Sequence, residues 1–197
     1  MEALNLVRER LVIDGLSLSI LRPQQADALL SEEAFEHEEF LPYWAELWPS
    51  GLALAHVVRR RDVRDLRVLE LGCGLGVPSI VAALGGAEVL ATDWSPEALE
   101  VAAANAERNG AAVETELVSW ADSERLERGA PWDLVLGGDL LYEQRNVDQL
   151  LALLPRLGGE TLLAEPGRPP SVRFFEEARA VFRIEEVADL VHRLTIG

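Results

Sequence analysis

A glycine-rich run followed by an aspartate carries the clearest chemical signal in this sequence. The run Glu70-Leu71-Gly72-Cys73-Gly74-Leu75-Gly76 lies between a predicted strand and a predicted helix, which is where an open α/β sheet binds its ligand. Asp93 follows at the end of the next predicted strand, close to the roughly 20-residue offset at which an acid reaches ribose hydroxyls. The two features together indicate a nucleoside-type ligand. The alternative interpretation of the run is a purely structural turn.

The charges around this run indicate which nucleoside it would bind. A dinucleotide-binding loop needs a third glycine where this chain has Val77, and its helix must receive a pyrophosphate. Glu70 would repel a pyrophosphate and suits a cation. S-adenosylmethionine carries an ammonium and a sulfonium, has no phosphate, and offers a ribose to Asp93. The pattern therefore favours S-adenosylmethionine, and a nicotinamide-dependent oxidoreductase is the second enzyme class.

The overall composition excludes several other kinds of chemistry. The 197 residues include 34 acidic and 18 basic ones, and the formal charge of −16 repels nucleic acid and anionic lipid. All the basic residues are arginine, which excludes Schiff-base chemistry, pyridoxal phosphate and a P-loop lysine. The single cysteine and the scattered histidines have no metal-ligand spacing. We therefore expect no metal. No apolar run could span a membrane and the N-terminus is too charged for a signal peptide, so we expect a cytoplasmic protein.

Strand-like and helix-like segments alternate from Leu66 onward, which predicts a doubly wound, Rossmann-like α/β sheet. Ser95, Pro96 and Glu97 are typical of a helix start. The expected strands cover residues 67–71, 87–92, 113–118, 132–137, 161–165, 182–187 and 191–196, the expected helices cover 77–84, 96–108, 147–157 and 171–180, and 166–170 should be a loop. The last two of these seven strands have no room for a helix between them, so they should be antiparallel.

The first 65 residues break this rhythm and should extend the same domain. Residues 10–21 alternate around Asp14-Gly15, which is a hairpin signal, and 49–60 should form a helix. Between them, residues 31–40 hold a run of glutamates. Such a run is more often a solvated face, although it could also meet a basic protein partner. We therefore expect one domain over 1–197, with 66–197 as the ligand-binding core and 1–65 as its cover.

Several motifs together resemble a known family. Glu70 to Gly74, Asp93 and the closing strand pair look like a class I S-adenosylmethionine-dependent methyltransferase. The runs Pro42 to Gly51, Gly138-Asp139-Leu140-Leu141-Tyr142 and Glu165-Pro166-Gly167-Arg168-Pro169 resemble the seven-β-strand protein-lysine methyltransferases of the family-16 type, and Leu18 to Pro23 is similar to their entry strand. Within that family, the chain resembles the group that methylates the β subunit of electron-transfer flavoprotein, together with its bacterial relatives. The resemblance spans nearly the whole chain.

The resemblance implies a role for each residue of the site. Asp139 and Tyr142 would be the catalytic residues between the donor sulfonium and the acceptor amine, with Asp139 orienting the amine rather than acting as its base. Burial in an aromatic slot would favour the neutral amine. Trp44, Glu46 and Arg168 would contact the substrate. Besides Asp139, the donor would be bound by Trp48, Glu70, Gly72, Cys73, Gly74, Asp93, Trp94, Ser119 and Trp120.

Some of these positions keep alternative interpretations. The tryptophans and Tyr142 could be ordinary packing residues, and Asp139 could be a turn residue. Arg168 could clamp an acidic substrate surface or could simply be solvated. Ser119 departs from the family, which often has an acid there, so the adenine contact could pass to backbone groups, Trp120 or Asp122.

The sequence therefore predicts an S-adenosylmethionine-dependent N-methyltransferase that acts on a lysine side chain of a protein. The electron-transfer flavoprotein β subunit is the first candidate substrate by resemblance, and neither nucleic acid nor a membrane is expected as a partner. Nucleobase-directed relatives carry Asn-Pro-Pro-aromatic where this chain has Asp139 to Tyr142. The alternatives are a small-molecule amine methyltransferase of the nicotinamide type and a non-catalytic module that binds the donor.

Overall fold

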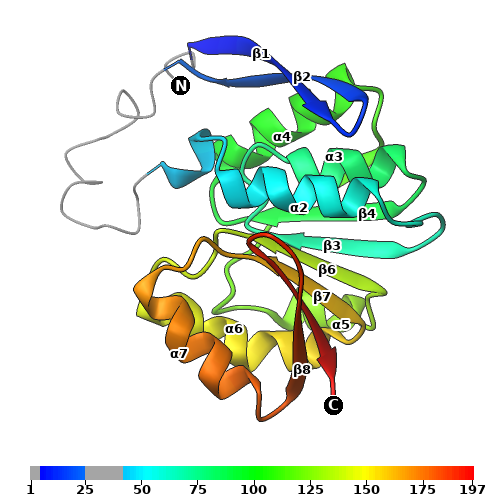
Figure 1. Ribbon diagram of the computed structural model, residues 1–197. Coiled ribbons are helices and arrows are strands. Elements are labelled where there is room, and N and C mark those ends of the chain that lie inside the picture. The colour runs from blue at the N-terminus through cyan, green and yellow to red at the C-terminus, as the bar shows by residue number, and fades with distance from the viewer. Residues whose placement is uncertain (1–4, 25–41) are drawn as a thin grey trace, which may run out of the picture.

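A seven-stranded mixed sheet forms the centre of the structure, a computed structural model that describes residues 5–24 and 42–197 (Figure 1). The strands are β3 (Arg67–Leu71), β4 (Glu88–Asp93), β5 (Val113–Leu117), β6 (Leu134–Gly138), β7 (Glu160–Ala164), β8 (Phe182–Ala188) and β9 (Val191–Ile196), in the order β5-β4-β3-β6-β7-β9-β8. β3 to β7 are parallel, whereas β9 runs antiparallel to both of its neighbours. The predicted sheet with an antiparallel last strand is confirmed. The acidic run at 31–40 lies outside the described residues.

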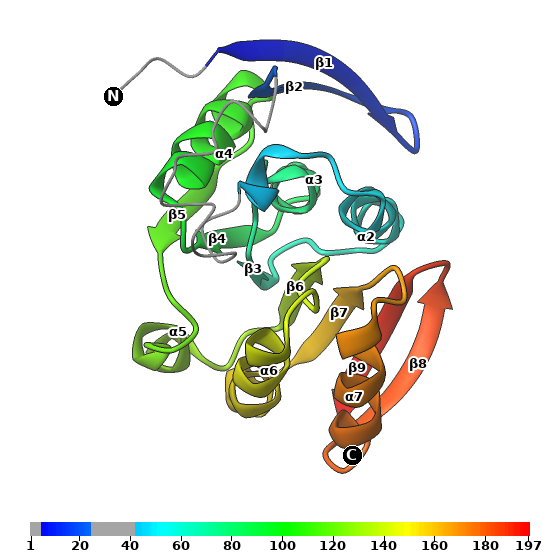
Figure 2. The same cartoon turned by 90° about the vertical axis from the view of Figure 1, so that its left-hand side faces the viewer.

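Helices cover both faces of this sheet (Figure 2). α2 (Pro49–Arg59), α3 (Val77–Leu84) and α4 (Pro96–Arg108) lie on one face, and α5 (Glu124–Gly129), α6 (Gln144–Leu157) and α7 (Pro169–Ala178) lie on the other. The central strands β3, β6 and β7 are almost continuously buried, as expected for parallel strands covered on both faces. The chain leaves β3 toward β4 and β5 and later returns to its other side as β6. The crevice beside this reversal is where ligands bind in such sheets.

The N-terminal hairpin packs on helices rather than on the sheet. β1 (Leu6–Ile13) and β2 (Leu16–Pro23) form a separate two-stranded sheet. Asp14 and Gly15 both have positive φ, 43° and 83°, as a tight two-residue hairpin turn requires. The hairpin lies on the outer side of α2 and α4 in both views (Figures 1 and 2). The predicted hairpin is confirmed.

α2 belongs to the helical layer that covers the sheet. Leu54, Ala55 and Val58 are fully buried, and the helix packs against α3, β6 and β7. Residues of the expected cover segment therefore contribute to the same hydrophobic core as residues 66–197.

Several predicted element boundaries differ from the structure by a few residues, and the larger differences have a physical reason. The short helices α5 and Tyr43–Ala45, the latter a 3₁₀ helix, were not predicted, because helices of one or two turns carry too little periodicity. Pro169 and Pro170, expected in a loop, form the first turn of α7, where the missing N–H of proline needs no partner. α6 begins at Gln144 rather than Val147. In the described part of the chain, every helix is too short or too polar to cross a bilayer.

Candidate functional site

The glycine-rich run forms the turn between β3 and α3, at the point where the strand order reverses. Gly72 and Gly74 have φ values of 59° and 50°, which glycine adopts without strain. A Cβ on Gly74 would lie 3.1 Å from the carbonyl oxygen of Trp44, and a Cβ on Gly72 would lie 2.7 Å from Cδ2 of Leu140. Glycine is therefore needed here both for the backbone conformation and for the close approach of two other segments.

Asp93 fixes the shape of this turn. Its carboxylate accepts hydrogen bonds from the N–H groups of Gly74, at 2.9 Å, and of Ser95, at 3.0 Å. The side chain is buried, and this burial raises the pKa of Asp93 above its usual value. Ser95 accepts from the N–H of Ala98, so the predicted cap of α4 is confirmed. The two features that first indicated a ligand site are in direct contact.

Glu70 lies beneath the turn and occupies the N-terminus of α3. One of its oxygens accepts from the N–H of Ser79 at 2.9 Å and also from the hydroxyl of Ser79. Burial raises the pKa of Glu70 to about 8, and the nearby Asp93 adds to the effect. The helix end that would face a pyrophosphate in a dinucleotide-binding fold is thus already occupied by a carboxyl group.

A cleft with two lobes opens beside the turn. The first lobe is lined by four acidic side chains, Glu46, Glu70, Asp93 and Asp139, and by no basic side chain of the described residues. The second lobe has a volume of about 320 Å³, which suits a small molecule. It is lined by Val118, Ser119, Arg145, Asn146 and Gln149, together with the residues shared by both lobes, Gly72, Trp94, Trp120 and Tyr142. The shared residues make the two lobes one continuous site.

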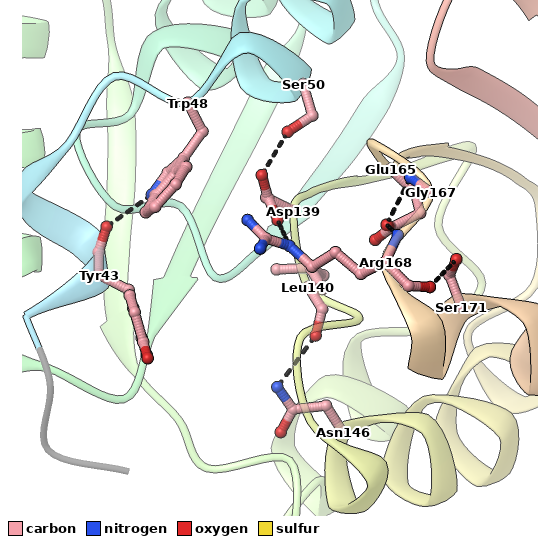
Figure 3. A network of polar contacts seen from close by, with 10 residues as sticks. All are labelled: Tyr43, Trp48, Ser50, Asp139, Leu140, Asn146, Glu165, Gly167, Arg168 and Ser171. Carbon is pink, nitrogen blue, oxygen red and sulfur yellow. Dashed lines mark hydrogen bonds and ion pairs between the residues drawn. The ribbon is translucent and has the colours of Figure 1, made fainter. Parts of the chain in front are cut away.

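Asp139 directly follows β6 and is held by three other segments of the chain (Figure 3). Its N–H donates to the carbonyl of Ala164 on β7 at 2.8 Å. Its two carboxylate oxygens accept from Oγ of Ser50 on α2 and from Nε of Arg168 before α7, each at 2.7 Å. The residue has a φ of 57°, a conformation that residues other than glycine rarely adopt unless their surroundings impose it. The buried carboxylate is therefore held in one orientation.

Aromatic rings form the wall next to Asp139. The indole Nε1 of Trp48 donates to the carbonyl of Tyr43 at 2.8 Å, and the rings of Tyr43 and Tyr142 have centroids 5.0 Å apart. Burial raises the pKa of Tyr142 to about 12, although a hydrogen bond with Asn146 acts in the other direction. The Tyr142 hydroxyl therefore stays protonated at physiological pH.

The structure brings most of the predicted site residues to this cleft. Those that line it are Tyr142, Asp139, Trp44, Glu46, Trp48, Glu70, Gly72, Cys73, Gly74, Asp93, Trp94, Ser119 and Trp120. Asp122 is exposed and lines neither lobe. Arg168 lines neither lobe; its guanidinium pairs with Asp139, which does. Burial raises the pKa of the Cys73 thiol, so this side chain is uncharged in the turn.

Sequence reasoning missed four residues that support the site: Ser50, Asn105, Asn146 and Glu165. Ser50 and Glu165 stand within the quoted motifs, but no local pattern gave them a role. Asn146 donates to the carbonyl of Leu140 at 2.9 Å and so holds the chain after Asp139. In the described residues, no group of three or more His, Cys, Asp or Glu side chains is arranged to hold a metal ion.

The sheet topology and the ligand cleft at its point of reversal define a class I methyltransferase fold. A solved structure with this fold, a 16S rRNA methyltransferase of T. thermophilus in complex with AdoMet and guanosine, superposes with a TM-score of 0.67 at 19% identity. The superposition covers 97% of this chain and 50% of that one.

The chain belongs to the lysine methyltransferase family, whose model matches residues 37–165. It is 38% identical over 134 residues to the electron transfer flavoprotein beta subunit lysine methyltransferase of Xenopus laevis, covering 64% of this chain and 53% of that protein. It is 34% identical over 154 residues to the protein N-lysine methyltransferase METTL21A of Danio rerio, covering 73% and 70%. The chain thus spans about half the length of the first of these relatives. The predicted family is confirmed.

The lining of the cleft fits S-adenosylmethionine, the donor of this fold class. A lobe with four acidic side chains and no basic one among the described residues suits a ligand that carries two positive centres and no phosphate. Asp93 at the end of β4 is a ready acceptor for ribose hydroxyls. The backbone at Gly72 and Gly74 leaves no room for side chains other than glycine's hydrogen.

Proposed function

We propose that the protein transfers a methyl group from S-adenosylmethionine to a lysine side chain of a protein substrate, with the β subunit of electron-transfer flavoprotein as the first candidate. The observation that carries the proposal is the buried Asp139 carboxylate, held beside the donor cleft next to an aromatic wall. Membership of the lysine methyltransferase family supports the reaction. The similarity to the flavoprotein-directed relatives supports the choice of substrate.

The two ends of the cleft would hold the donor. Asp93 would accept hydrogen bonds from its ribose hydroxyls, Glu70 would line the part of the lobe beside the glycine-rich turn, and Trp120 with the second lobe would receive the adenine ring. When bound, S-adenosylmethionine supplies an electrophilic methyl group on a sulfonium sulfur. Trp48, Tyr43 and Tyr142 would exclude water from the path between donor and acceptor.

The acceptor amine must be uncharged to act as a nucleophile, yet the usual pKa of a lysine is about 10.4. Desolvation between aromatic rings lowers the pKa of an amine, which favours the neutral form. Asp139 would accept a hydrogen bond from that amine and direct its lone pair along the transfer path. Tyr142 keeps its proton up to a pH of about 12, so it would shape the slot rather than act as a base.

The test uses purified protein, methyl-labelled S-adenosylmethionine, and either recombinant electron-transfer flavoprotein β subunit or a bacterial extract. The label is followed separately into protein and into small molecules, and labelled protein is hydrolysed to identify the methylated amino acid. The chain contains no lysine, so it cannot contribute methyl-lysine of its own. Methyl-lysine on one or two proteins supports the proposal, whereas label confined to small molecules supports an amine methyltransferase instead. Donor binding without transfer to any acceptor would contradict an enzymatic role.

A further inference from the structure

Arg168 is held in the acceptor region by contacts from three directions (Figure 3). Its Nε lies 2.7 Å from Oδ1 of Asp139, and its guanidinium carbon lies 5.4 Å from the centre of the Trp48 ring. Its own N–H donates to the carboxylate of Glu165 at 2.7 Å. Only 34% of the side chain is exposed. A solvated loop arginine would make neither of the two side-chain contacts, so this guanidinium is held against Asp139 and Trp48 at the site.

The turn that precedes α7 fixes the position of this arginine. One oxygen of Glu165 accepts from the N–H groups of both Gly167 and Arg168, which closes the turn. On the other side, the carbonyl of Arg168 accepts from the N–H and the hydroxyl of Ser171 in the first turn of α7. The backbone is therefore anchored on both sides, and the side chain reaches across the sheet edge to Asp139.

The ion pair affects the charge that the acceptor slot favours. An unpaired carboxylate close to an amine stabilises the ammonium form and raises the pKa of that amine, typically by about 1–3 units. This effect opposes methylation, because the protonated nitrogen has no lone pair. A guanidinium bound to the same carboxylate offsets its charge. A carboxylate offers about four lone-pair positions, so Asp139 keeps acceptor capacity after binding Ser50 and Arg168.

The other groups described around Asp139 are uncharged or acidic, so Arg168 is the one that offsets the charge of its carboxylate. Ser50, from α2, is uncharged, and Tyr142, after β6, keeps its proton. Glu165, after β7, is acidic. Two backbone N–H groups donate hydrogen bonds to its carboxyl group, and burial raises its pKa. Asp93, at the end of β4, is likewise bound by backbone N–H groups, and Glu46 and Tyr43 stand at the exposed side of the lobe. In the described part of the chain, Arg168 is the basic side chain that contacts Asp139.

We propose that Arg168 determines the charge specificity of the acceptor slot: its guanidinium offsets the charge of Asp139, so that the slot binds an uncharged amine in preference to an ammonium ion. This inference rests on the proposed function of the site. The ammonium of the incoming side chain releases its proton to solvent before the amine enters, and Asp139 then orients the neutral nitrogen through a hydrogen bond.

The test compares a charged and an uncharged probe of the same shape. n-Butylamine, which is a cation near neutral pH, and 1-butanol are titrated by calorimetry into protein saturated with S-adenosylhomocysteine. The Arg168→Met variant removes the guanidinium charge, and Arg173→Met removes an arginine from the exposed side of the same helix as a matched control. We expect Arg168→Met to bind the butylammonium ion about 10-fold more tightly or better, with the binding of 1-butanol unchanged. Arg173→Met should leave both affinities unchanged.

Two further variants separate charge from structure. Arg168→Lys keeps the charge and should restore the wild-type preference; no methyl donor is present in this experiment, so its amine is not modified. Arg168→Gln removes the charge but keeps a donor, and replaces Arg168→Met if that variant does not fold. Unchanged butylammonium binding, or an equal loss of both probes, would overturn the proposal. Absence of methyl transfer by the wild-type protein would instead refute the proposed function, because probe binding does not depend on transfer.

Discussion

Asn105 on α4 holds both backbone polar groups of Leu21 on β2. Its Oδ1 accepts from the N–H of Leu21 at 2.6 Å, and its Nδ2 donates to the carbonyl of Leu21 at 3.0 Å. The same Nδ2 donates to the carbonyl of Leu75 in the glycine-rich turn at 3.1 Å. One fully buried side chain therefore joins the N-terminal hairpin to the turn that forms the donor cleft. Asn109, one helical turn later, makes the equivalent pair of bonds with Ser19 but does not bind the turn.

Replacing these two asparagines should separate stability from donor binding. Asn105→Ala leaves buried polar groups of Leu21 and Leu75 unpaired, so we expect a loss of about 1–3 kcal/mol in the free energy of unfolding and weaker donor binding. Asn109→Ala should destabilise the hairpin without changing donor affinity. Urea denaturation and calorimetry with S-adenosylmethionine measure the two effects. Equal donor affinities for the two variants would show that Asn105 does not support the turn.

Gly74→Ala should damage the donor cleft by two routes. The φ of 50° disfavours alanine, by about 1–2 kcal/mol for a left-handed conformation. In addition, the new Cβ would lie 3.1 Å from the carbonyl oxygen of Trp44 and push that segment away. Gly110→Ala is the matched control, because Gly110 has a φ of 69° but open space around it. We expect both variants to lose stability and only Gly74→Ala to bind S-adenosylmethionine more weakly, as measured by calorimetry.

Glu70 should make the stability of the protein depend on pH in a defined window. Burial raises its pKa from 4.5 to about 8, so this carboxyl stabilises the fold fully below pH 4.5 and loses that contribution as the pH rises toward 8. Glu70→Gln cannot ionise. Its free energy of unfolding relative to the wild type should therefore rise by up to about 1.4 kcal/mol per pH unit through this window and then level off.

Urea denaturation of both proteins at several pH values measures this difference. Glu88→Gln, at an exposed glutamate of β4, is the matched control for the removal of one carboxyl group. A flat difference for Glu70→Gln would mean that the Glu70 carboxyl is ionised throughout.

Asp139→Asn should separate donor binding from methyl transfer. The variant keeps the shape of the side chain but loses the charge that pairs with Arg168 and part of its acceptor capacity. We expect S-adenosylmethionine to bind almost as before, while transfer of the label falls by about 100-fold or more because the amine is no longer aligned. Asp122→Asn, at an exposed aspartate outside both lobes, is the control. Unimpaired turnover by Asp139→Asn would contradict the role assigned to this residue.

Tyr142→Phe tests whether the hydroxyl takes part in proton transfer. Its pKa of about 12 keeps it protonated, so we expect the pH profile of methyl transfer to keep its shape and the rate to fall only slightly. A residue that acts as a general base would instead reduce the rate by about 100-fold or more when removed. The initial rate of label transfer as a function of pH distinguishes the two cases.

The sequence could predict those elements whose signals come from residues close together along the chain. The helix at Pro96–Arg108 has its cap at Ser95 and its stop at Gly110, so its bounds agree with the structure. The turn at Gly72 to Gly76 depends on backbone conformations that glycine alone adopts easily. The short helix Glu124–Gly129 could not be found in the same way, because it carries one buried residue, Leu126, and no apolar period.

The sequence by itself determined the alternation of strands and helices, the glycine-rich turn and the acids that follow the strands, because these signals are local. Only the tertiary structure decided which side chains meet at Asp139. Ser50 is 89 residues away from it in the chain and Arg168 is 29 residues away. Asp139 and Arg168 meet because the parallel neighbours β6 and β7 end at the same edge of the sheet, and Ser50 reaches them from α2, which packs on these two strands. The pairing of Arg168 with Asp139 depends on the strand order, and no spacing along the chain records it.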